Sequence, residues 1–138
     1  MSHAASFTHT ASRGRAAIVA LWIVQIALAA MFLLAGGSKL AGAPAMVSLF
    51  DAVGIGQWFR YVTGLIEVGS AVALLVPRVA VFGALALVPT MIGATLTQLI
   101  IVHQSAVPPA VLLVAAAGVL WTRRQELPIG PWMSKAGL

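Results

Sequence analysis

Four long apolar runs dominate this sequence, and only one acidic residue lies inside them. The runs cover residues 16–37, 58–76, 79–102 and 107–122, and the acid is Glu67. At about 1.5 Å of rise per helical residue, the first three are long enough to cross a bilayer core, and the fourth needs part of its flanks to do so. The pattern therefore predicts an all-α fold, an integral membrane four-helix bundle.

Composition supports a membrane protein and excludes several other classes. The 138 residues are 61% hydrophobic and 8% charged, whereas soluble domains average about 25% charged residues. There is no cysteine, which excludes disulfides, thiolate zinc sites and iron–sulfur ligation. The net charge of +5 comes from basic residues that flank the apolar runs, so it indicates membrane topology and no nucleic-acid partner. His3 and His9 are too far in sequence from His103 to predict a metal site.

The chain divides into a disordered cytoplasmic tail over residues 1–15, a four-span membrane domain over residues 16–122 and a second cytoplasmic tail over residues 123–138. The first run is too long for the apolar region of a signal peptide, about 7–15 residues. Four spans place both termini on one side. That side carries Arg13, Arg15, Arg78, Arg123, Arg124 and Lys135, against only Lys39 and Arg60 on the other. The positive-inside rule then predicts that both termini are cytoplasmic.

The connection over residues 40–57 is apolar enough to form structure of its own. Pro44 suits the start of a short amphipathic helix that lies in the interface or dips back into the bundle, and Gly54 suits its end. Within the third run, Pro89 predicts a kink that frees the carbonyl near Leu85, which Thr90 or another span could help to satisfy.

Glu67 needs a physical reason to lie near the middle of its run. A central Asp, Lys or Arg costs roughly 2.5–3.5 kcal/mol on insertion scales, and a Glu should cost a comparable amount. One interpretation is a protonated, hydrogen-bonded Glu67 that locks helices together. The other is a ligand, quinone or proton site. The residues alone leave both open.

Polar and small residues recur at helical spacing on each run and predict its inward face. These stripes are Gln25, Ala29, Phe32, Gly36 and Lys39 on the first run; Arg60, Gly64, Glu67 and Ala71 on the second, with Thr63 and Ser70 at its edge; Thr90, Gly93, Ala94, Thr97 and Gln98 on the third; and Ala110, Val114, Ala117, Gly118 and Trp121 on the fourth. Counting residues places Gln25 and Thr90 at the depth of Glu67. The stripes predict a polar cleft that opens outward with Glu67 at its floor.

The candidate ligand-binding residues are Glu67, Lys39, Gln25, Thr63, Arg60 and Gln98. No catalytic group and no metal ligand is predicted. Lys39 is about two or three turns above Glu67 by the same count, so a direct ion pair needs Lys39 to reach inward or its helix to tilt. Each residue also has a structural interpretation: Gln25 as an interhelical hydrogen-bond partner, Arg60 as a snorkelling interface residue, Gln98 as a packing residue.

Two short motifs resemble a known family. The first run ends in AGGSKLAG, the connection holds Phe50 and Gly54, and the second run reads GLIEVGSAVALLVPR. This arrangement is similar to the DoxX and DoxX-like group of small four-span bacterial membrane proteins, over about residues 18–122. The most specific pieces are Gly-x-x-Lys, ending at Lys39, and Gly-x-x-Glu, ending at Glu67. DoxX proteins proper often start the first span with an Arg where this chain offers Gln25, which favours the DoxX-like branch.

The resemblance implies a location and a class of function. It implies the bacterial cytoplasmic membrane and a membrane subunit, or quinone- or small-lipophile-binding component, of a redox complex with a protein partner. Some members resemble a membrane subunit of thiosulfate:quinone oxidoreductase. No residue pattern here supplies a redox cofactor of the chain's own, and quinone is the one cofactor the family suggests. Whether the chain is an enzyme stays open. The alternatives are binding or transport of a small apolar metabolite, and a structural or assembly module.

Overall fold

The computed structural model describes residues 4–128, and every regular element in that range is helical. The helices are α1 (Ala4–Ala41), α2 (Pro44–Val53), α3 (Gln57–Leu74), α4 (Ala80–Thr97) and α5 (Val107–Arg123), with a π-helix η1 (Gln98–Val102) continuing α4 and a 3₁₀ turn η2 (Arg124–Glu126) after α5. The all-α prediction is confirmed. Part of each predicted tail, including His3 and Lys135, lies outside the described residues.

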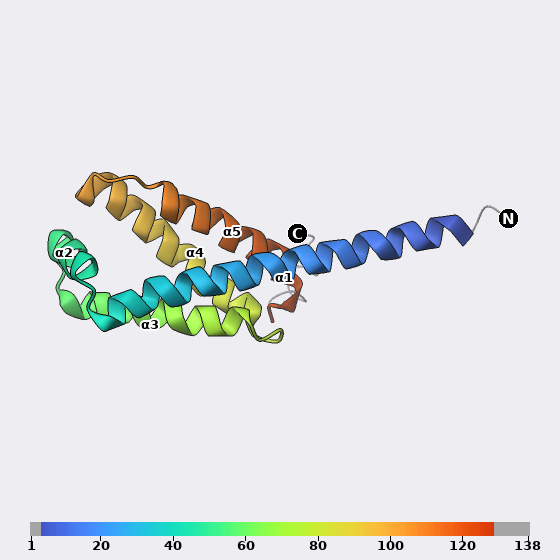
Figure 1. Cartoon of the computed structure of the whole chain (residues 1–138), viewed down its shortest axis with the longest axis horizontal. Coiled ribbons are helices and arrows are strands. Elements are labelled where there is room, and N and C mark those ends of the chain that lie inside the picture. The colour runs from blue at the N-terminus through green and yellow to red at the C-terminus, as the bar shows by residue number, and fades with distance from the viewer. Residues whose placement is uncertain (1–3, 129–138) are drawn as a thin grey trace.

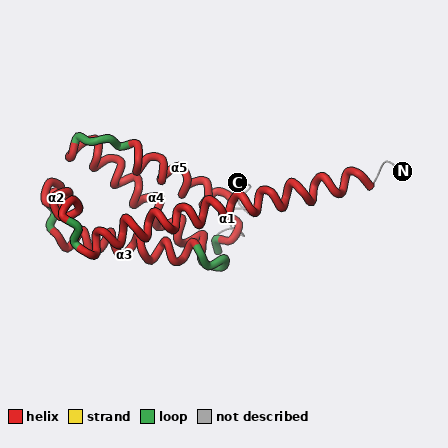
Figure 2. The backbone as a smooth tube through the Cα atoms, in the orientation of Figure 1, coloured by secondary structure: helices red, strands yellow, loops and turns green. Residues whose placement is uncertain are grey.

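The four long helices form two pairs. Helix α1 packs on α3 and runs antiparallel to it, α4 packs on α5, and α3 joins the two pairs through its contact with α4 (Figure 1). Figure 1 shows α2 lying across one end of the bundle and the first turns of α1 extending beyond the other end. Loops between successive helices are short (Figure 2). The end that carries α2 is called the α2 end below.

The core contains apolar side chains, and so does much of the surface. The buried cluster consists of Leu28, Ala29, Phe32, Ala71, Leu74, Ala84, Leu87, Met91, Ala116 and Val119. On the outside, Leu34 is 73% exposed and Ile100 is 65% exposed. Apolar residues facing outward around a bundle are expected where lipid covers that surface, and they are rare in water.

Two helical stretches are long and apolar enough to cross a membrane, Gly14–Ala41 with 28 residues and Ala80–Val102 with 23. Helices α3 and α5 are shorter, with 18 and 17 residues. Length and composition therefore support a helical membrane protein, and the total of four spans stays a prediction.

Two glycines, Gly36 and Gly83, allow the helices to approach closely. A Cβ added to Gly36 would lie 2.8 Å from Val68 Cγ2 and 2.9 Å from the Gly64 carbonyl oxygen. A Cβ on Gly83 would lie 2.7 Å from the Ser70 carbonyl oxygen. Since such distances leave no room for a side chain, Gly36 sets the contact of α1 with α3, and Gly83 sets that of α3 with α4.

Helix α1 is longer at both ends than the predicted first span. It begins at Ala4, inside the segment predicted as a disordered tail, where there is no proline to stop the helix. It also continues through Gly36 and Gly37 and ends only at Ala41, before Gly42 with a φ of 73°. Two glycines within a packed apolar helix loosen it less than the sequence suggests, because tertiary contacts outweigh their low helix propensity.

The short helix between the first two spans is confirmed as α2. Pro44 is at its start, and Gly54 ends it in the left-handed conformation, with a φ of 78° and its N–H donated to the Phe50 carbonyl. Phe50 is buried and its ring packs edge-on against Phe59 of α3, with 5.9 Å between ring centroids. Whether α2 lies at the membrane interface stays a prediction.

The predicted inward stripes are correct for α1 and α3 and wrong for α5. On α5, Val114 is 72% and Trp121 is 67% exposed, and the buried residues are Pro109, Ala116, Val119 and Arg123. Small residues on α5 occur on both faces, so they do not distinguish the inside of the bundle from the lipid side.

The predicted stripe of α4 is correct only in part. Gly93 is exposed, Thr90 and Gln98 are half-buried, and the fully buried positions run from Ala80 to Met91. The hydroxyl of Thr90 donates to the Ala86 carbonyl at 2.8 Å, beside the Leu85 carbonyl that Pro89 cannot bond.

Adding a methyl group at Gly36 should separate α1 from α3. We expect Gly36→Ala to lower the free energy of unfolding by about 1–3 kcal/mol, the usual cost of overpacking. Gly69→Ala is the matched control, because nothing lies within 4 Å of a Cβ at that position. Thermal unfolding of both variants in detergent would measure this, and equal stability of the two would contradict the close contact.

Candidate functional site

An ion pair joins α1 and α3 inside the bundle. Lys39 Nζ lies 2.9 Å from Glu67 Oε2 and 3.1 Å from Oε1. The Glu67 side chain is 3% exposed and that of Lys39 is 13% exposed. The structure therefore forms the direct contact that counting residues left in doubt. Gly36 lies against Gly64 and Glu67, and a lysine side chain leans back towards the start of its own helix.

The spacing of the two family motifs has a direct structural explanation. In Gly36-x-x-Lys39 and in Gly64-x-x-Glu67, the glycine and the charged residue are about one turn apart and share a helix face. The two glycines meet, with a Cβ on Gly64 placed 3.1 Å from the Gly36 carbonyl oxygen. Because the backbones are so close, the charged side chains one turn away can reach each other.

Arg60 fixes the end of α1 to α3. Its side chain is 4% exposed, so it is buried and does not snorkel to the interface as the structural interpretation expected. Its Nη1 donates to the Lys39 carbonyl oxygen, and its Nε donates to Gln57 Oε1 at 2.6 Å. The Lys39 carbonyl also accepts from the Gly42 N–H at 3.3 Å, and a guanidinium at the last carbonyls of a helix adds a charged donor and complements the helix dipole.

Gln57 fastens α2 to this cluster, a role that the sequence did not reveal. Its Nε2 donates to the Val47 carbonyl at 3.0 Å and to Asp51 Oδ1 at 2.7 Å. Since Oε1 of the same amide accepts from Arg60, one side chain connects α2 and α3, and through Arg60 it connects both to α1. A glutamine at a helix start carries no sequence signal that would have marked it.

Thr63 and Gln98 lie towards the same end of the bundle but do not bond to the ion pair. The Thr63 hydroxyl is 3.1 Å from the Phe59 and Arg60 carbonyls and donates within its own helix. Gln98 is half-buried at the start of η1, and its Oε1 is buried without a hydrogen-bond partner in the described part of the chain.

Gln25 belongs to a second polar cluster at the opposite end, so its predicted place at the depth of Glu67 is wrong. Its Nε2 donates to the Leu74 carbonyl at 2.7 Å, and its Oε1 accepts from Arg123 Nε at 2.8 Å. Gln25 and Lys39 are about 21 Å apart along α1 at 1.5 Å per residue. The interpretation of Gln25 as an interhelical hydrogen-bond partner is confirmed.

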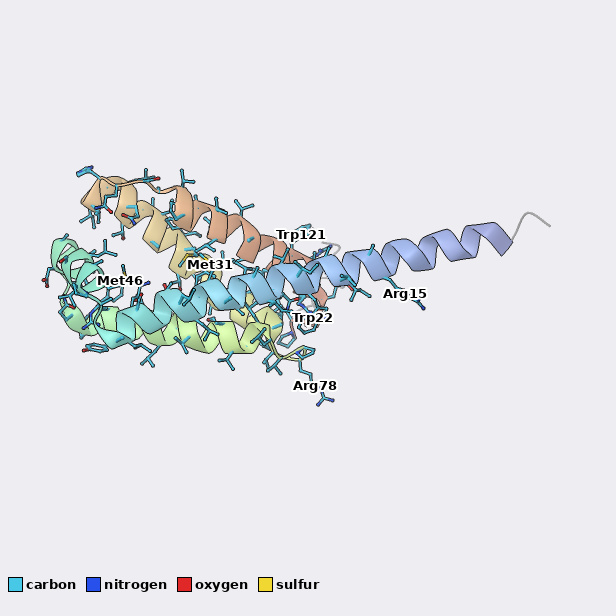
Figure 3. The ribbon with its side chains drawn as sticks, viewed as in Figure 1. Arg15, Trp22, Met31, Met46, Arg78 and Trp121 are labelled. Atoms are coloured by element: carbon cyan, nitrogen blue, oxygen red, sulfur yellow. The ribbon has the colours of Figure 1, made fainter. Side chains whose placement is uncertain are left out.

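Arg123 is the buried centre of this second cluster and was expected only as a topology signal. Its Nη1 lies 2.8 Å from Glu126 Oε1, and its guanidinium lies 5.5 Å from the centre of the Trp22 ring. Figure 3 shows Trp22, Trp121 and Arg78 at this end of the bundle. Every polar atom of Gln25 is used in holding α1, α3 and α5 together.

The ion pair retains chemistry that a ligand could use. A lysine ammonium has three N–H donors and no acceptor, and two of them can be directed at the two oxygens of Glu67. The third can donate to a carbonyl oxygen from outside, since Lys39 is partly exposed. Among the side chains that the structure describes, residues 14–128, no group of three or more His, Asp or Glu residues could hold a metal ion.

Removing one partner of the ion pair should destabilise the bundle more than removing both. We expect Lys39→Met to cost about 3–5 kcal/mol, because it leaves Glu67 buried without its partner. The double variant Lys39→Met/Glu67→Met should recover most of this loss, since apolar replacement of a buried pair is often neutral. A double-mutant cycle of unfolding free energies would measure the coupling, and additive losses would contradict it.

Comparison with known proteins agrees with the two motifs. The sequence profile of the DoxX-like family matches residues 23–119, which include Gly36, Lys39, Gly64 and Glu67. No curated protein and no solved structure matches the chain. Because the match covers most of the chain, and because apolar side chains surround the bundle, this protein belongs to the DoxX-like family of membrane proteins.

Proposed function

We propose that this protein is a four-span component of a membrane redox complex that binds a quinone, or a similar small lipophilic molecule, beside Lys39 and Glu67. In this proposal it lies in the bacterial cytoplasmic membrane with both termini in the cytoplasm. The observation that carries the proposal is the buried ion pair between α1 and α3, at 2.9 Å. Ionisable residues inside membrane proteins most often mark functional sites.

A gain in folding stability does not explain why an ion pair is buried at this place. Each charge loses its hydration on burial, and mutual attraction returns that loss only when the geometry is good. Two apolar side chains at these positions would pack into the bundle without this cost. The pair therefore supports a role in binding more strongly than a role in holding the helices together.

The chemistry of the site suits a quinone head group. A quinone carries carbonyl oxygens, which can accept from the free donor of Lys39, and its quinol carries hydroxyl groups, which can donate to Glu67. The remainder of such a molecule is apolar and suits the outer surface of the bundle, where Leu34, Leu65 and Ile100 are more than half exposed. Since the chain has no cysteine, it has no thiol chemistry of its own, and electrons would reach a bound quinone from a partner protein.

A second candidate function is a structural or assembly module. It is favoured by the network through Arg60 and Gln57, which ties α1, α2 and α3 together at the α2 end. In that case the Lys39–Glu67 ion pair is another contact that holds α1 and α3 together, and the protein needs no ligand. Binding or transport of a small apolar metabolite is a third candidate, which uses the same site without redox chemistry.

Quinone binding to the folded double variant separates these functions. We expect the wild-type protein in nanodiscs to bind a decyl-substituted benzoquinone, measured by quenching of tryptophan fluorescence. The variant Lys39→Met/Glu67→Met should remain folded and bind at least about tenfold more weakly, because one good hydrogen bond to a charged donor is worth that much or more.

Gly69→Ala serves as the control, because its site is on α3 but faces open space. Equal binding by wild type and the double variant would reject the site and leave the structural module. Binding of an unrelated apolar metabolite by wild type, with no quinone binding, would favour the third candidate.

A further inference from the structure

The side chain of Gln98 contains a buried polar atom that the rest of the described chain leaves unsatisfied. Its Oε1 has no hydrogen-bond partner, and no other buried side-chain oxygen or nitrogen within the described residues shares this condition. Leaving such a group unpaired costs about as much as losing a hydrogen bond, so it calls for an explanation.

Gln98 occupies an inward position at an irregular part of the helix. It follows Met91, which is buried in the core, by about two helical turns and so shares its face. It is the first residue of the π-helix η1, and π-turns occur frequently at functional sites. Its backbone carbonyl accepts from the N–H groups of His103 and Gln104, where the chain reverses. The backbone carbonyl of Gln98 thus has hydrogen-bond partners, and its side-chain oxygen has none.

The residues around Gln98 on its helix face are less deeply buried than the core. On α4 the last fully buried residue is Met91, and the next inward positions, Ala94 and Thr97, are only half-buried. The two helix pairs spread apart towards the α2 end, where α2 meets η1 (Figure 1). Lys39 and Gln98 lie at this same end, on opposite helix pairs.

We propose that Gln98 Oε1 accepts a hydrogen bond from the hydroxyl group of a lipophilic ligand, and so makes the site prefer the reduced form of a quinone. This inference rests on the proposed function and adds a selectivity to it. The buried atom of the Gln98 amide is its oxygen, which cannot bond to the carbonyl acceptors of a quinone but can accept from the O–H donors of a quinol. Lys39 does not discriminate in this way, because the oxygen of either form accepts from an ammonium.

The test compares the affinities of a decyl benzoquinol and the corresponding benzoquinone under anaerobic conditions. We expect wild type to bind the quinol roughly tenfold more tightly, the value of about one hydrogen bond. Gln98→Met, which has a similar length and no polar atom at that place, should abolish the preference. It should also raise the unfolding temperature of the ligand-free protein, because it removes an unsatisfied buried group.

Gln104→Met is the matched control, since that glutamine is exposed on the adjacent turn. Equal affinities in wild type, a preference for the quinone, or an unchanged ratio in Gln98→Met would overturn the inference while the proposed function stands. A lower unfolding temperature in Gln98→Met would also overturn it, because the amide would then be a stabilising contact. Binding of neither form by wild type would instead reject the proposed function.

Discussion

The contact between Gly36 and Gly64 is the constraint on which the α2 end of this protein depends. Only two helices without side chains at these positions can approach so closely. That approach brings Lys39 and Glu67 within 2.9 Å, and it places the last carbonyl groups of α1 within reach of Arg60. Arg60 in turn orients Gln57, which holds α2. A motif of two glycines and two charges therefore positions three helices.

A cluster of polar side chains joins the helices near each end of the bundle, and the middle of the bundle is apolar. Gln25 and Arg123 join α1, α3 and α5 at one end, and Lys39 and Glu67 join α1 and α3 towards the other. Between them, Phe32, Ala71 and Leu87 are fully buried. In lipid the hydrophobic effect gives little preference for one helix pairing over another. Close packing at glycines and hydrogen bonds between helices must therefore determine which helices pair.

Sequence reasoning succeeded where polar residues stand out from an apolar background. The inward faces of α1 and α3 were predictable because Gln25, Lys39, Arg60 and Glu67 mark them. The relative depths of Gln25 and Glu67 in the membrane were not predictable. Counting residues assumed that the first helix ends near Gly36, whereas the helix packs on α3 and continues to Ala41.

The face of α5 was not predictable either, because Ala117 and Gly118 are as acceptable to lipid as to a helix interface. The role of Gln57 depends on where α2 comes to lie, which no local pattern states.

Two glutamines in the same bundle, Gln25 and Gln98, differ in the hydrogen bonding of their side-chain amides, and this difference bears on function. Both amide atoms of Gln25 are bonded, to the Leu74 carbonyl and to Arg123, as expected for a residue whose purpose is to hold helices together. Gln98 leaves its buried oxygen unused, and Lys39 retains a donor that Glu67 does not occupy. Selection for stability alone would favour apolar side chains at such positions. Gln98 Oε1 and the remaining N–H donor of Lys39 both lie towards the α2 end, so the proposed ligand is expected at that end and not at the end of Gln25 and Arg123.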